Sequence, residues 1–159
     1  MKKINNPFAG NDGYNCFGCS PDNHHGLKLE FWYDEELKTV EAKWNPADYL
    51  QGYTGVLHGG IQATIMDEIA SWAIYVVLET AGVTSKMEIR YLKPVLISNG
   101  MITIKATSIQ AEKRLADVKV ELYDGNNLLC AEATVQYFIY PQEIAIKRLN
   151  YPGIKAFIG

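Results

Sequence analysis

Residues 55–72 of the chain read GVLHGGIQATIMDEIASW, and this stretch decides the fold. His58, Gly59 and Gly60 stand at the start of an almost entirely apolar run, which predicts a long helix. The first turn of a helix leaves backbone N–H groups without partners and concentrates positive partial charge, so this start can receive a carbonyl oxygen or an anion. At about 3.6 residues per turn, Asp67 lies on the same face as Gly60, two turns further along.

The face that carries Asp67 is otherwise made of small residues, which leaves space for another group; these are Gly60, Ala63, Thr64, Ala70 and Ser71. Asp67 interrupts an apolar segment, and carboxylates in such surroundings are usually paired, hydrogen-bonded or functional. We therefore interpret Asp67 as a functional residue, with a structural role in helix packing as the alternative. Glu68 projects roughly 100° away around the helix and is expected to be partly exposed or to lie at an interface.

Composition limits the classes of function. A chain of 159 residues, 48% of them hydrophobic, is large enough for one globular domain over residues 1–159. The net charge of −3 argues against a dedicated nucleic-acid binder. The longest apolar run, Ile69–Leu78, is about half of what a membrane span requires, so no membrane partner is expected. The N-terminus lacks the apolar stretch of a secretion signal, which favours a cytoplasmic location.

Three cysteines are an odd set and do not suggest a disulfide framework. Cys16 and Cys19 form a Cys-x-x-Cys pair, followed closely by His24 and His25. We expect a structural turn near the ligand pocket and no metal, because there is no second Cys-x-x-Cys pair; a zinc site is the alternative. A redox role is less favoured because no βαβ context follows. Cys130 lies in an apolar strand and is expected in the core.

The remaining pattern predicts one helix among antiparallel strands. The helix is expected over residues 58–81 and Gly82 should end it. Strands are expected at residues 27–33, 38–44, 86–92, 101–109, 115–123 and 128–140, as a hairpin before the helix and a four-strand meander after it. Residues 1–25 read as an irregular lead-in, and residues 141–159 as a tail without clear period. A helix that is apolar nearly all round must be wrapped, so the fold class is α+β with a curved antiparallel sheet.

This layout, with the pattern Gly-x-x-His-Gly-Gly-x-x-x-x-x-x-Asp over residues 55–67, resembles the hotdog-fold acyl-CoA thioesterases. The phenylacetate-pathway and 4-hydroxybenzoyl-CoA thioesterase groups are the most similar, over about residues 14–140. Supporting stretches are Cys16-Phe-Gly-Cys19, Asn23-x-x-Gly26-Leu27, Gln51-Gly52 and Met87-x-Ile89-x-Tyr91-x-x-Pro94. The fold alone does not fix the function, because hydratases and non-catalytic proteins share it.

The resemblance implies hydrolysis of an acyl-CoA or acyl-carrier thioester, without a cofactor. Asp67 would be the general base or nucleophile, the Gly59 amide would polarise the thioester carbonyl, and Gly60 would bind substrate. His58 would orient the loop or the sulfur side of the thioester. Thr84 would help to place the water and would come from a neighbouring subunit, so a homodimer or homotetramer is expected.

Other positions are weaker candidates for binding substrate. Some relatives carry Asn or Gln six residues before the motif histidine, where this chain has Gly52, and Gln51 is the candidate substitute. Lys113 and Arg114 suit coenzyme A phosphates by charge, although basic turns are more often simply solvated. Tyr91 is a further candidate. Two alternative functions remain open at this point: a non-catalytic acyl-CoA-binding module, and, less favoured, an enoyl-thioester hydratase.

Overall fold

The computed structural model describes all 159 residues and contains a seven-stranded sheet in which every pairing is antiparallel. The strand order is β1-β2-β3-β5-β6-β7-β4. The strands are β1 (Lys2–Lys3), β2 (Trp32–Asp34), β3 (Thr39–Trp44), β4 (Gly82–Tyr91), β5 (Ile102–Glu112), β6 (Leu115–Tyr123) and β7 (Leu129–Ile139). The helices are α1 (Gly59–Val77), α2 (Gln142–Leu149) and α3 (Lys155–Ile158), with short 3-10 turns η1 (Asp48–Leu50) and η2 (Ile97–Asn99).

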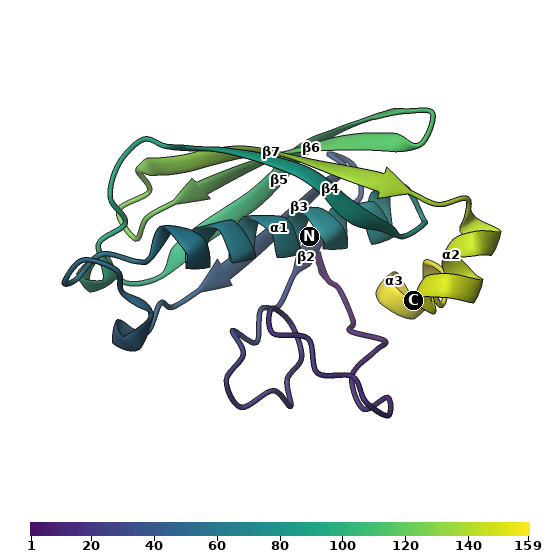
Figure 1. Cartoon of the computed structure of the whole chain (residues 1–159), viewed down its shortest axis with the longest axis horizontal. Helices are drawn as coiled ribbons and strands as arrows, with labels where there is room; N and C mark the ends of the chain where they lie inside the picture. Colours follow the sequence, from purple (N-terminus) through teal and green to yellow (C-terminus); the bar gives the residue numbers. More distant parts are fainter.

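Helix α1 lies against one face of the sheet, while the N-terminal loop and the C-terminal helices lie on the other side of α1 (Figure 1). The core forms between them because the strands alternate: Val118, Val120 and Leu122 of β6 are fully buried and their neighbours are not. Nine residues of α1 are buried, as expected for a helix covered on two sides. The predicted α+β class, a curved antiparallel sheet around one long helix, is confirmed.

The predicted end of the long helix at Gly82 is wrong. Helix α1 stops at Val77, and Glu79 takes the left-handed conformation that turns the chain back, with φ of 53°. Gly82 instead begins β4, where a Cβ atom would lie 2.4 Å from the Phe138 carbonyl oxygen of β7. The glycine therefore serves close pairing of two strands rather than a helix cap.

The predicted four-strand meander is also wrong in one respect. Strands β5, β6 and β7 do follow one another, but β4 pairs with β7 at the far edge of the sheet. The segment after β4 crosses back through η2, so that β5 pairs with β3. Of the predicted strand over residues 27–33, only β2 joins the sheet, although Leu27, Leu29 and Phe31 are buried as the alternation predicts.

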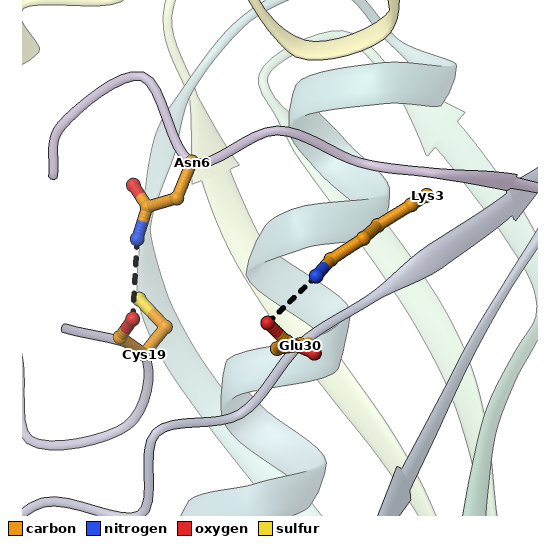
Figure 2. Close-up of polar contacts among 4 residues, drawn as sticks. All are labelled: Lys3, Asn6, Cys19 and Glu30. Atoms are coloured by element: carbon orange, nitrogen blue, oxygen red, sulfur yellow. Dashed lines mark hydrogen bonds and ion pairs between the residues drawn. The ribbon is translucent and has the colours of Figure 1, made fainter. Parts of the chain in front are cut away.

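The lead-in and the tail both pack on the body of the molecule. Asn6 donates a hydrogen bond to the Cys19 carbonyl oxygen (3.1 Å), and Lys3 pairs with Glu30 (2.7 Å), which fastens the first residues to the loop that follows (Figure 2). In the tail, Tyr151 and Phe157 are fully buried. No helix is long and apolar enough to cross a membrane.

Candidate active site at the start and middle of helix α1

The loop before α1 is folded so that His58 begins the helix. Gln51 forms an isolated antiparallel bridge with Leu57, and its side-chain oxygen accepts a hydrogen bond from the Gly55 amide (2.7 Å). Gly55 has a φ of 80°, a conformation that favours glycine. Gln51, a candidate for binding substrate, thus uses its oxygen to brace the loop and keeps its NH₂ group as a free donor.

His58 is the N-cap of α1. Its Nδ1 accepts a hydrogen bond from the Gly60 amide (2.9 Å), so the nitrogen that carries a proton in the neutral ring is Nε2. The Gly60 amide is therefore occupied within the chain and is not available to a ligand. The amide of Gly59, the first helical residue, has no hydrogen-bond acceptor in the chain. One N–H at the positive end of α1 is thus free to meet an oxygen from outside.

Tyr91, at the end of β4, covers this helix start. Its hydroxyl donates a hydrogen bond to the Gly59 carbonyl oxygen (2.7 Å), and its ring would lie 3.4 Å from a Cβ atom at position 59. The tyrosine remains 52% exposed, while its hydroxyl is committed to Gly59; contact of its exposed face with substrate stays a prediction. Glycine at position 59 leaves room for the ring.

Asp67 is held by two hydroxyl groups from two strands. Thr84 of β4 donates to Asp67 Oδ1 (2.8 Å), and the Tyr137 hydroxyl of β7 is shared between Asp67 Oδ1 and the Asp67 carbonyl oxygen, both at 2.7 Å. Oδ2 has no hydrogen-bond partner in the chain and is the oxygen that can accept a proton. The contact between Thr84 and Asp67 forms within one chain, so it does not require the neighbouring subunit that we expected.

Tyr137 is a hydrogen-bond partner of Asp67 that the sequence analysis missed. Burial, and secondarily the charge of Asp67, raise the pKa of Tyr137 far above its usual range, so the residue is a hydrogen-bond donor at any ordinary pH. It lies 70 residues from Asp67 in the sequence. The available signal was its place in the final predicted strand, in phase with the inward-facing Val135.

Lys113 and Arg114 lie in the turn between β5 and β6, at the opposite end of the molecule from the start of α1 (Figure 1). With Asp117 and Gln136 they line a hollow of about 690 Å³. Gln136 points to the opposite sheet face from its neighbour Tyr137. A single chain therefore does not bring these two cations to Asp67.

Comparison with known proteins finds similarity to thioesterases and esterases. A family model described as the thioesterase superfamily matches residues 54–131. A protein of Saccharolobus solfataricus named as a candidate esterase is 34% identical over 99 residues, which cover 62% of this chain and 65% of that protein. A similarly named protein of Sulfurisphaera tokodaii is 32% identical over 105 residues, which cover 66% of this chain and 68% of that protein.

Two more distant likenesses concern coenzyme A. The mouse acyl-coenzyme A thioesterase THEM4 is 26% identical over 113 residues, covering 70% of this chain and 48% of that protein. A Streptococcus mutans protein solved with bound acetyl-CoA superposes with a TM-score of 0.66 at 20% identity, covering 82% of this chain and 96% of that one. This last likeness is one of fold. The chain thus spans about two thirds of the first two relatives and about half of the mouse enzyme.

Proposed function

Because this chain belongs to the thioesterase superfamily, we propose that it hydrolyses acyl-CoA thioesters to a free acid and a thiol. The observations that carry the proposal are a free amide at Gly59 and a carboxylate at Asp67 on the same helix. Eight residues at about 1.5 Å each separate these groups by about 12 Å along α1, so both can reach one thioester only where two copies of the chain meet, with the amide from one copy and the carboxylate from the other. The presence of acetyl-CoA in the Streptococcus mutans protein, and the activity named for the mouse relative, support coenzyme A as the thiol.

The proposed chemistry uses the two groups in the same step, the addition of water to the thioester. Oδ2 of Asp67 takes a proton from a water molecule, which attacks the thioester carbonyl carbon; such positioned bases typically contribute about 10²–10⁴-fold in rate. The carbonyl oxygen becomes negative as the tetrahedral intermediate forms, and the Gly59 amide donates to it, aided by the dipole of α1. The intermediate then collapses, the carbon–sulfur bond breaks, and the leaving thiolate takes up the proton held by Asp67, which yields the free thiol and restores the carboxylate.

The other residues serve this pair. Thr84 and Tyr137 hold Oδ1 of the Asp67 carboxylate and leave Oδ2 without a partner in the chain, which supports Oδ2 as the proton acceptor. His58 holds the Gly60 amide and Tyr91 holds the Gly59 carbonyl, which together set the direction of the Gly59 N–H. The free NH₂ of Gln51 is a donor that can bind the water or the substrate. Lys113 and Arg114 can meet coenzyme A phosphates only at a site completed by a second copy of the chain.

Incubation of the purified chain with a panel of acyl-CoA thioesters and a thiol-trapping reagent tests the proposal. We expect catalytic release of coenzyme A from at least one member, saturable in substrate. Loss of enoyl absorbance without thiol release would assign a hydratase instead. Saturable binding without turnover, measured by calorimetry on the same panel, would assign a non-catalytic binding module.

A further inference from the structure

The Cys-x-x-Cys turn of the lead-in meets helix α1 at Glu68. The Sγ atoms of Cys16 and Cys19 and a carboxylate oxygen of Glu68 all lie within 4.8 Å of one another, and both thiols are free. Cys16 Sγ is 3.5 Å and 3.8 Å from the two Glu68 oxygens. His24 and His25 are exposed and do not belong to this cluster. The structure thus adds a third ligand that spacing in the sequence did not reveal.

Glu68 is a half-buried carboxylate without a cation beside it. Burial raises its pKa to about 7, and it makes no ion pair. The indole N–H of Trp72 donates to it (3.2 Å), but the other groups facing it are thiols. Partial removal of a carboxylate from water without a positive partner costs free energy, and a bound cation would offset that cost.

The turn holds the sulfur atoms of Cys16 and Cys19 beside Glu68. The hydrogen bond between the two thiols lowers the pKa of Cys16 to about 5, and the same bond, together with burial, raises the pKa of Cys19. A Cβ atom on Gly18 would lie 2.5 Å from the Glu68 carboxylate, so the turn fits closely around that side chain. Asn6 holds the Cys19 carbonyl from outside (Figure 2), and outer contacts of this kind orient metal ligands.

We propose that Cys16, Cys19 and Glu68 bind one zinc ion. Two thiolates and a carboxylate are ligands that zinc accepts, at about 2.3 Å for sulfur and about 2.0–2.2 Å for oxygen. With these bond lengths, neighbouring ligand atoms of a tetrahedron lie roughly 3.4–3.8 Å apart. The three donor atoms now lie within 4.8 Å of one another, so each pair needs to approach by roughly 1 Å at most. Cys16 is half-buried, so a water molecule takes the fourth position.

The ion would act as a structural link rather than in catalysis. Glu68 points to the lead-in, whereas its neighbour Asp67 points to Thr84 and Tyr137 of the sheet. A zinc ion would therefore fasten the lead-in to α1 without contacting the thioester site. This inference does not depend on the proposed hydrolysis, and its test needs no substrate.

The test is a titration of the full, metal-free chain with Co²⁺, followed by absorption in the thiolate-to-cobalt charge-transfer region. Alkylation and intact-mass measurement first establish that both thiols are reduced. We expect one equivalent of Co²⁺ to bind and to be displaced by Zn²⁺. The absence of a charge-transfer band in protein with both thiols reduced would overturn the proposal.

Three variants make the result specific to this cluster. The double variant Cys16→Ser/Cys19→Ser should lose the band, and Glu68→Gln, which keeps the side-chain volume, should weaken binding by more than about tenfold, the loss that even an outer partner of a ligand causes. Cys130→Ser, in the buried strand β7, should bind like the wild type. Wild-type affinity in a folded Glu68→Gln variant, or a retained band in the double variant, would contradict the assigned ligands.

Discussion

Asp67 and Glu68 are adjacent carboxylates with opposite surroundings. Asp67 faces the sheet, where two hydroxyl groups donate to one of its oxygens and leave the other free. Glu68 faces the lead-in and its thiols. Their separation by roughly 100° around the helix follows from helical geometry and was predictable from the sequence. The chemistry that each one can perform depends on partners from distant strands and loops, which the local sequence does not reveal.

At this scale the hydroxyl of Tyr137 is the most informative group to remove. Tyr137→Phe deletes a hydrogen bond to a charged group, worth about 1.5–3 kcal/mol, so we expect turnover to fall by about tenfold to a hundredfold. Steady-state thiol release measures this effect.

Tyr151→Phe is the matched control, because it removes another buried tyrosine hydroxyl, bonded to the Tyr75 carbonyl (3.0 Å). It should cost similar stability in a thermal melt and leave turnover near the wild-type rate. Equal turnover in the two variants would show that Tyr137 does not position Asp67.

Among the elements, local patterns predicted most of the strands and the start of the helix. The alternation of residues 115–123 gave the bounds of β6 as the structure has them. The end of α1 was missed because Glu79, and not a glycine, takes the left-handed conformation. The tail helices were missed because α2 buries only Ala145 and α3 is four residues long, so neither carries a helical period of apolar residues.

Gly82 gives a test of this reinterpretation. Gly82→Ala places a Cβ atom 2.4 Å from the Phe138 carbonyl oxygen, a backbone atom that cannot move cheaply. We expect a loss of about 1–3 kcal/mol in the free energy of unfolding, as for other overpacked positions. Chemical denaturation measures it.

The control is Gly52→Ala, whose Cβ atom would meet nothing closer than 3.4 Å and which should unfold nearly like the wild type. If Gly82→Ala were as stable as Gly52→Ala, the close approach of β4 to β7 would not be what requires glycine at position 82.

For the candidate site, the sequence predicted the groups that lie on α1. It did not predict the side chains that reach α1 from distant strands and loops. His58, Gly59 and Asp67 lie within ten residues, so helical periodicity places them. Tyr137 reaches Asp67 only because β7 pairs with β4 and packs over α1, an arrangement set by long-range pairing. The contact of Glu68 with the two cysteines was missed for the same reason, because it joins residues that are far apart in the sequence.

In the whole molecule, β4 is a ten-residue edge strand whose outer side has no partner in the chain. Long unpaired edges are templates for pairing with another strand. The exposed side chains of Val83, Tyr91 and Leu92 add apolar surface along this edge. Thr84, which contacts Asp67, lies in the same strand, so a partner at this edge would complete the candidate site.

We therefore predict a symmetric dimer joined through β4, measured by light scattering at micromolar concentration. Val83→Lys should shift the chain toward monomer, because lysine on an edge strand opposes pairing. Leu128→Lys, an equally exposed position in the turn before β7, should leave the dimer intact. A wild-type chain that is only monomeric would contradict this assembly.

The central claim, that Asp67 accepts the proton of the attacking water, is tested most directly by the turnover of Asp67→Asn. This variant keeps the size of the side chain but removes the basic oxygen. We expect kcat for thiol release to fall by about 10²–10⁴-fold while KM changes little, because the loss falls on the transition state. Asp22→Asn, the same change at an exposed loop position, should keep the wild-type rate. A folded Asp67→Asn variant that turns over at the wild-type rate would contradict the account.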